Sequence, residues 1–308
     1  MITIEKLSLF NIESFRKLYN EKYQSYICDK DFFNIYDEES FLIKYMLRKQ
    51  VKLFRAENEL VGYIWYDESK ADCYSSNIYS IYIMDDFIDY FNNRSLDDLK
   101  INTLKFDIVE NKKIIRLMNK LGFGILNKTS LMKLEDYKGF IEVEEDVEFK
   151  HFSKNCDEKL RCDIQNEIFY DINRNPLSSN DIFEEEEQEY YIDNFSVFLC
   201  VKGKYVGYGQ IILSSGLYTI VNFGIIEEYR QQGYGQTLLT YLIELCKINN
   251  ISDLYIRVEK NNYKAVSLYN KIGFREYISY DTWYKSIIWM KWGFIDEKSA
   301  YRWCKGCN

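Results

Sequence analysis

The sequence predicts an α/β protein of the α+β kind, made of two tandem domains in which helices flank a mixed, mostly antiparallel sheet. The chain has 308 residues, and a typical domain has about 150, so two domains are expected. Short β-type segments alternate with helical segments, which is typical of a sheet covered by helices. Two short patterns also recur in the same order at an offset of about 150 residues.

The recurring patterns lie in corresponding predicted elements. Val-Gly-Tyr occurs at 61–63 and again at 206–208, each time inside a predicted hairpin. A Gly-Phe pair follows a predicted helix at 122–123 and again at 273–274. Because both matches keep the same order and nearly the same offset, the sequence indicates a duplicated domain.

We expect the two copies to join in the charged stretch LEDYKGFIEVEED at 134–146. This gives a first domain over residues 1–138 and a second over 139–308. Hydrophobic residues make up 47% of the chain and aromatic ones 17%, which is ample for two packed cores.

The second copy can be followed element by element. Apolar residues recur on one face of a helix at Leu238, Leu242 and Leu245, and Gly273 ends the next helix. The hairpin shows alternating apolar positions around a Lys-Gly-Lys turn. The expected elements are a strand at 147–152, helical segments within 156–194, a hairpin at 197–213, a strand at 217–226, a helix at 235–249, a strand at 253–259, a helix at 262–273, and one or two strands within 275–292.

Composition excludes several classes of function. The net charge of −8 argues against nucleic acid as the main partner. The chain has no apolar run of about 18 residues, and its N-terminus lacks a signal-peptide core, so we expect a cytoplasmic protein without a membrane partner.

Metal and histidine chemistry are also disfavoured. Cys304 and Cys307 form a C-x-x-C pair that could supply half of a zinc site, but four ligands are needed. His151 is the single histidine and lies far from that pair in sequence. A Ser-His-Asp or Cys-His mechanism is therefore not expected, and we interpret His151 as structural.

The distribution of charge points to one region of interest. Residues 142–194 contain 17 acidic and five basic side chains, a net charge of −12. A local acidic region can attract a cationic ligand. The alternative, that these carboxylates lie on solvated helix faces, stays open for each of them.

The stretch RQQGYGQ at 230–236 lies between a predicted strand and a predicted helix. A helix N-terminus presents unpaired N–H groups and favours an anion, and glycine lets a phosphate approach closely. The pattern is not the dinucleotide fingerprint, because Leu238 stands where a third glycine would be required. Taken alone, the stretch is either a phosphate-binding turn or an ordinary tight turn.

Together with the elements around it, this turn resembles the GNAT superfamily of N-acetyltransferases. The family's pattern is a strand followed by [RQ]-x-x-G-x-[GA] opening a helix, matched at 230–235. A further strand then leads into N-x-x-A-x-x-L-Y-x-K-x-G-F. The resemblance is strong over 197–280 and loose over 147–196. The second pattern is matched by Asn262, Ala265, Leu268, Tyr269, Lys271, Gly273 and Phe274.

The resemblance implies an acetyl-CoA site in this copy. The backbones of Phe223 and Ile225 would pair with the pantetheine arm, and Asn262 would hydrogen-bond to it. Tyr269 would stand near the thioester sulfur and protonate the leaving thiolate, although a core tyrosine is the alternative. The pyrophosphate would be held by N–H groups of the turn, flanked by Arg230. The turn residues are Gln231, Gln232, Gly233, Tyr234, Gly235 and Gln236.

We therefore expect direct acetyl transfer from acetyl-CoA to a primary amine, without a metal. The acidic segment favours a cationic small molecule as acceptor. The general base is left open among Asp171, a carboxylate within 184–189, and Tyr218 acting through water. The alternative function is a non-catalytic module that binds or senses CoA.

The first copy departs from the pattern. No glycine stands in DDFIDYFNNRSLDD, and Asp85 and Asp86 would repel a pyrophosphate. Asn111 is kept, but Met118 replaces the tyrosine. This copy resembles the degenerate partner of tandem GNAT enzymes, and would either cover one side of the active site or dock a protein.

Overall fold

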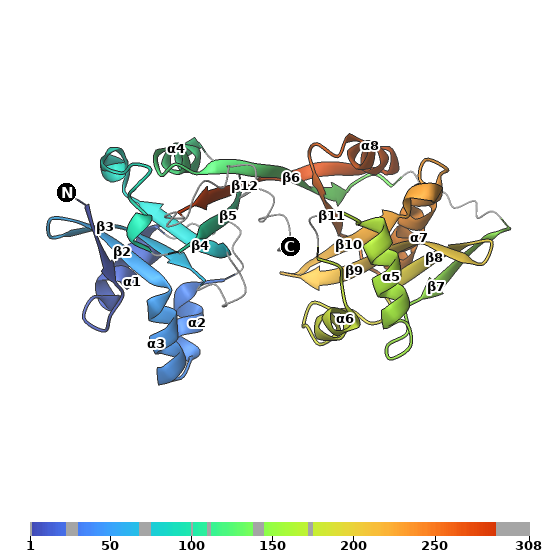
Figure 1. The fold of residues 1–308 in the computed structure, drawn as a ribbon, viewed down its shortest axis with the longest axis horizontal. Helices are drawn as coiled ribbons and strands as arrows, with labels where there is room; N and C mark the ends of the chain where they lie inside the picture. The colour runs from blue at the N-terminus through green and yellow to red at the C-terminus, as the bar shows by residue number, and fades with distance from the viewer. Residues whose placement is uncertain are drawn as a thin grey trace, which may run out of the picture. The chain divides into compact units, whose positions relative to one another are not determined.

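A computed structural model describes most of the chain (Figure 1). Contacts divide it into two compact units. Among the residues that the structure describes, unit 1 contains those up to Lys128 and those from Tyr280 to Ile287, and unit 2 contains those within Thr129–Ser279. The described residues are 2–22, 30–67, 75–99, 101–109, 112–137, 145–171 and 175–287.

Unit 2 is built on a sheet with strand order β6-β11-β10-β9-β8-β7. Its neighbouring strands pair antiparallel except β10 with β11, which are parallel. The elements predicted for the second copy are confirmed to within a few residues, and β6 and η3, which were not predicted, are present in addition. They are β6 (Gly124–Leu134), β7 (Val147–His151), α5 (Glu158–Ile168), α6 (Ser179–Glu186), β8 (Ser196–Val201), β9 (Lys204–Ser214), β10 (Leu217–Ile225), η3 (Glu227–Tyr229), α7 (Tyr234–Ile248), β11 (Leu254–Glu259), α8 (Tyr263–Ile272) and β12 (Phe274–Ser286).

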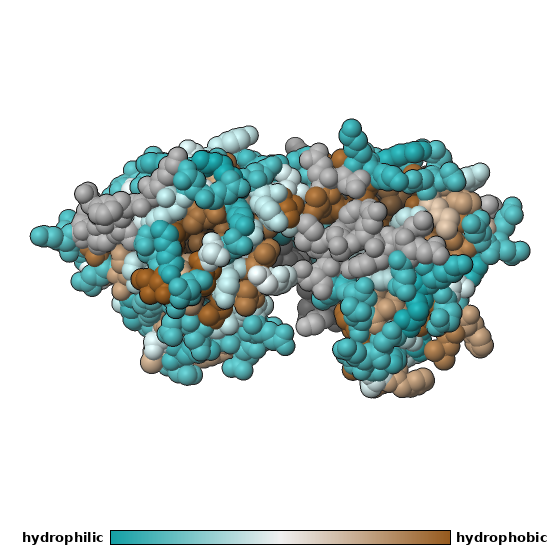
Figure 2. Space-filling model, turned by 180° about the vertical axis from the view of Figure 1, so that it is seen from behind, coloured by the Kyte–Doolittle hydropathy of each residue, from teal (hydrophilic) through white to brown (hydrophobic). Residues whose placement is uncertain are grey.

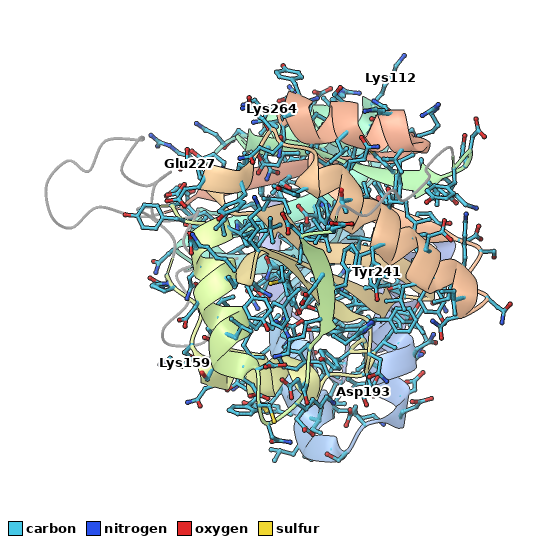
Figure 3. The ribbon with its side chains drawn as sticks, turned by 90° about the vertical axis from the view of Figure 1, so that its right-hand side faces the viewer. Lys112, Lys159, Asp193, Glu227, Tyr241 and Lys264 are labelled. Carbon is cyan, nitrogen blue, oxygen red and sulfur yellow. The ribbon has the colours of Figure 1, made fainter. Side chains whose placement is uncertain are left out.

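Strand β9 separates two layers of helices in unit 2. A Cβ built on Gly209 would lie 2.7 Å from Leu242 of α7, so this position faces α7. Because side chains alternate along a strand, the next residue, Gln210, faces the other side. Its hydrogen bond to Arg161 of α5 confirms that orientation. Helices α5 and α7 therefore cover opposite faces of the sheet, as Figure 3 shows with Lys159 marking α5 and Tyr241 marking α7.

Unit 1 repeats this plan with strand order β1-β2-β3-β4-β5-β12. Strands β4 and β5 are parallel, and the other neighbouring pairs are antiparallel. The elements of unit 1 are β1 (Ile2–Lys6), α1 (Ile12–Lys22), α2 (Phe32–Glu38), α3 (Phe41–Lys49), β2 (Val51–Ala56), β3 (Glu59–Tyr66), β4 (Ser75–Ile83), η1 (Asp85–Tyr90), η2 (Asp97–Leu99), β5 (Thr103–Val109) and α4 (Lys112–Lys120).

Figure 2 shows one face of the molecule coloured by hydropathy. Most of the coloured residues on this face are hydrophilic, and apolar ones form patches between them.

Each unit takes its outer strand from the other repeat. Thr129–Lys133 of β6 follow the first repeat in sequence but pair with β11 of unit 2. Tyr280–Ser286 of β12 follow the second repeat but pair with β5 of unit 1. The two compact units are thus not two consecutive stretches of sequence, because unit 1 combines residues from both ends of the chain. The boundary between 1–138 and 139–308 refers to the two sequence repeats, and it stays a prediction.

Candidate functional site

The parallel strands β10 and β11 separate part-way along their length. They pair only where Tyr218–Ile220 of β10 meet Leu254–Ile256 of β11. Beyond this point the register of β10 against β9 shifts between Val221 and Gly224, which marks a β-bulge. Asn222 lies in the bulge with φ = 52°, a left-handed conformation that asparagine tolerates better than most residues. The bulge bends β10 and leaves backbone groups of both strands without a partner strand.

A cavity of about 250 Å³ occupies the place where the two strands separate. It is lined by both strands, by the end of α5 and by α8, so side chains from both faces of the sheet reach it. The sequence-predicted residues Phe223, Asn262 and Tyr269 are brought together here. The lining residues are Phe169, Ile220, Val221, Asn222, Phe223, Ile256, Arg257, Val258, Glu259, Asn262 and Tyr269.

The backbone of β10 presents hydrogen-bonding groups away from β9. The Ile226 N–H donates to the Val206 carbonyl of β9 at 2.9 Å. Since N–H groups alternate in direction along a strand, that of Ile225 points the other way, toward the separated β11. Ile225 is one of the two positions that the resemblance assigns to a pantetheine arm, and the other, Phe223, lies in the bulge.

The glycine turn forms the N-terminus of α7. Gly233 is the N-cap residue with φ = 94°, and Gln231 also has a positive φ of 63°. No side chain caps the helix, and the first intrahelical bond is donated by the Thr237 N–H to the Gly233 carbonyl. The N–H groups of Tyr234, Gly235 and Gln236 precede that bond and are the donors a helix leaves for an anion.

The polar side chains of the turn are engaged within unit 2. Arg230 donates to the carbonyls of Ile225 and Ile168, each at 2.8 Å, and so ties the end of β10 to the end of α5. Gln232 donates to the Glu228 carbonyl. The side-chain oxygen of Gln236 accepts from Lys271 at 2.8 Å. The side chain of Arg230 thus stabilises the end of β10. The groups that the turn leaves for an anion are the backbone N–H groups at the start of α7.

Tyr269 lies on α8 between two aromatic rings. Its side chain is only 5% exposed, and its ring centre lies 6.2 Å from that of Phe223 and 6.1 Å from that of Phe274. Burial raises the pKa of Tyr269 well above its usual range, so the hydroxyl stays protonated at neutral pH. Asn262 caps α8, with its side-chain oxygen accepting from the Ala265 N–H at 3.2 Å.

The glutamates within 184–189, at the end of α6 and just after it, occupy three different environments. Glu184, Glu187 and Glu189 are exposed. Glu186 is buried, and desolvation together with the nearby Glu158 raises its pKa. Glu185 is 2.5 Å from Arg161, which is completely buried. Sequence reasoning missed Arg161, because its partners lie 24 and 49 residues away in the chain.

His151 bridges two parts of unit 2. Its ring nitrogens lie 2.9 Å from the Asn194 carbonyl and 2.9 Å from the Tyr241 hydroxyl. It does not line the cavity, which agrees with the structural interpretation. The pair Cys304 and Cys307 lies outside the described residues, as does Asn111.

The corresponding region of unit 1 has a different structure. The segment after β4 forms the 3-10 helices η1 and η2. Asp85 is exposed and pairs with Lys113 of α4 at 2.7 Å, while Met118 is fully buried. Among the described residues, no helix is long and apolar enough to span a membrane.

Comparison with known families supports the geometry of unit 2. Residues 162–274 match the family model described as "Acetyltransferase (GNAT) family". The matched segment contains the bulged β10, the glycine turn and all of α8. The turn and the cavity described above therefore lie within the part of the chain that is similar to this family.

Curated relatives are similar over parts of this domain. The [ribosomal protein bS18]-alanine N-acetyltransferase of Escherichia coli strain K12 is 30% identical over 100 residues, which is 32% of this chain and 64% of that protein. The chain thus spans less than two thirds of that relative's length. An N-alpha-acetyltransferase of Saccharolobus solfataricus is 34% identical over 58 residues, 18% of this chain and 35% of that protein.

Solved structures share the fold of the whole chain. A GCN5-related N-acetyltransferase from Sphaerobacter thermophilus superposes with a TM-score of 0.61 at 15% identity, covering 93% of this chain and 96% of that one. A tandem GNAT protein from the clavulanic acid biosynthesis pathway gives a TM-score of 0.55 at 8% identity, covering 94% and 99%. These likenesses show two GNAT-like folds in tandem.

Proposed function

We propose that the GNAT-like domain of unit 2 transfers an acetyl group from acetyl-CoA directly to a primary amine. The observation that carries this proposal is the cavity between the separated strands, which Tyr269 lines within the same domain as the uncapped N-terminus of α7. In this proposal the N–H groups of the glycine turn bind the pyrophosphate. The backbones of Phe223 and Ile225 pair with the pantetheine arm, and Asn262 lies beside it.

The reaction needs three things from the protein. The attacking amine must be neutral and aimed at the thioester carbon. The oxygen of that carbonyl gains negative charge, which the Ile225 N–H can stabilise as a fixed donor. The leaving sulfur also gains negative charge, and Tyr269 can donate a hydrogen bond or proton to it. Because burial raises the pKa of Tyr269 further above that of a thiol, hydrogen-bond donation is the larger part of its role.

The two substrates would approach from opposite faces of the sheet. The glycine turn opens α7, which covers one face, so the donor belongs on that side. The acidic helix α6 lies with α5 on the other face, where Asn222 contacts the cavity. Negative charge on this side favours a cationic acceptor. We therefore propose a cationic small-molecule amine as the acceptor.

The names of the relatives favour a second acceptor class. Two of them are named as acetyltransferases of a protein alanine or of N-alpha amines. A peptide N-terminus is also a primary amine, and it is cationic when protonated. Both acceptor classes therefore belong in the first experiment.

We also propose that unit 1 is a degenerate copy that does not bind acetyl-CoA. This is supported by η1 and η2, which follow β4 where α7 follows β10 in unit 2. The exposed Asp85 and Asp86 would repel a pyrophosphate there. We further propose that the protein is cytoplasmic, as expected from the sequence.

The proposal is tested with the full chain and acetyl-CoA. Release of free thiol is followed with spermidine and with a peptide that begins with alanine, and mass spectrometry looks for an acetylated product. CoA binding is measured separately by calorimetry. Turnover with either amine supports the enzyme. Tight CoA binding without turnover on a broad amine panel supports the non-catalytic module instead.

A further inference from the structure

A buried network of hydrogen bonds lies on the α5 and α6 face of unit 2, beside the cavity. Its centre is Gln210 of β9, which is fully buried. The Gln210 side-chain oxygen accepts from Arg161 at 3.0 Å and from Asn222 at 3.3 Å. Its side-chain nitrogen donates to Glu185 at 2.9 Å. Asn222 is the member of this network that also lines the cavity.

Arg161 is held rigidly at the base of the network. Its guanidinium lies 5.7 Å from the ring centre of Phe152 and 5.2 Å from that of Tyr208. It also pairs with Glu185 at 2.5 Å. Arg161 thus donates through a single nitrogen, Nη2, to both Glu185 and Gln210.

The network fixes which way each amide points. Arginine can only donate hydrogen bonds, and an ionised carboxylate can only accept them. Gln210 must therefore turn its oxygen to Arg161 and its nitrogen to Glu185. Asn222 meets that same oxygen, so it must present its nitrogen there. Its own side-chain oxygen is consequently turned away from Gln210.

We propose that the Oδ1 atom of Asn222 accepts a hydrogen bond from the amino group of the acceptor. This inference rests on the proposed function, because it places the amine at the cavity that holds the thioester. A neutral primary amine has two N–H donors and one lone pair. A hydrogen bond from one N–H to Asn222 restrains rotation of the amino group and leaves the lone pair free to face the thioester carbon.

The chemical step is balanced with this arrangement. The amine nitrogen forms a bond to the acyl carbon, and the carbon–sulfur bond breaks with its electron pair going to sulfur. The nitrogen loses one proton and the sulfur gains one, which gives an amide and a free thiol. Asn222 stays unchanged, so it is a positioning and specificity residue that contacts the substrate.

Asn222→Gly is the direct test, because glycine keeps the left-handed backbone of the bulge and removes only the amide. Asn250→Gly is the matched control, since Asn250 also has a positive φ, 58°, but is exposed and does not line the cavity. We expect kcat/KM for spermidine or for the alanine peptide to fall about 10- to 100-fold in Asn222→Gly. The dissociation constant of CoA should stay unchanged in both variants.

Asn222→Asp is a second test, because it keeps an acceptor oxygen for the amine while it replaces the Nδ2 donor to Gln210 with a second oxygen. We expect its kcat/KM for the amine to be closer to wild type than that of Asn222→Gly. Unchanged amine kinetics in Asn222→Gly, or equal losses of CoA affinity in both variants, would overturn the inference. Failure of the proposed function is distinguishable, because the wild-type chain itself would then acetylate neither amine.

Discussion

Alanine substitutions at the two glycines of the glycine turn, Gly233 and Gly235, should change the stability of the protein in opposite directions. A methyl group on Gly235 would lie 3.6 Å from Leu268 and 3.8 Å from Ile225, which is ordinary contact. Alanine also favours a helix over glycine, so Gly235→Ala should raise the free energy of unfolding by up to about 1 kcal/mol. Gly233 has open space around it but a φ of 94°. Gly233→Ala should therefore lower that free energy by about 1–2 kcal/mol.

Cofactor binding should respond differently from stability. We expect a methyl group on Gly235 to hinder the close approach of a phosphate oxygen to the N–H groups of the turn. Losing one charge-assisted hydrogen bond costs about 1.5–3 kcal/mol, which corresponds to about a 10- to 150-fold loss of CoA affinity. Gly235→Ala should thus be more stable than wild type and bind CoA less tightly.

The assays are urea unfolding followed by circular dichroism and calorimetric titration with CoA. Gly203→Ala is the control for backbone strain, because Gly203 has φ = 77° and open space in the turn between β8 and β9. It should lose stability as Gly233→Ala does, but keep its CoA affinity. Wild-type affinity in Gly235→Ala would refute the assignment of this turn to the pyrophosphate.

Three further predictions concern the interior of unit 2. Tyr269→Phe should lower kcat about 100-fold with unchanged CoA affinity, measured against Tyr263→Phe, an exposed tyrosine on the same helix. Burial and Glu158 raise the pKa of Glu186, so the folded state loses stability as the pH rises above about 4.5, where the unfolded carboxyl ionises. Glu186→Gln should therefore raise Tm at pH 7 and leave it unchanged below pH 4. Glu185→Gln should lower the free energy of unfolding by about 3 kcal/mol because it leaves Arg161 buried without its partner, and adding Arg161→Met should recover most of that loss in a urea double-mutant cycle.

Local elements of unit 2 were predictable because their signals are local. The short apolar runs of β8 and β9, the apolar face around Leu238 and Leu242, and the stop at Gly273 each depend on residues a few positions apart. The glycine turn and Tyr269 were each found from the spacing of residues within a short sequence pattern. These positions are therefore visible in a single sequence.

Other parts of the site depend on contacts between distant residues. Arg161 meets Glu185 and Gln210 across the fold, and nothing near position 161 indicates this pairing. Arg230 has the residue type of a phosphate ligand, but the structure directs two of its donors to backbone carbonyls. The bulge at Asn222 arises from the register of β10 against β9, which the strand's own sequence does not specify.

The exchanged outer strands also bear on how the protein is synthesised. The Thr282 hydroxyl of β12 bonds to Asp107 of β5, a partner that precedes it by 175 residues. The sheet of unit 1 therefore cannot close until nearly all of unit 2 has left the ribosome. Removing residues 1–138 would also take away β6 and leave β11 with an unprotected edge. The first repeat thus contributes a strand to the sheet of unit 2 whether or not it binds a cofactor.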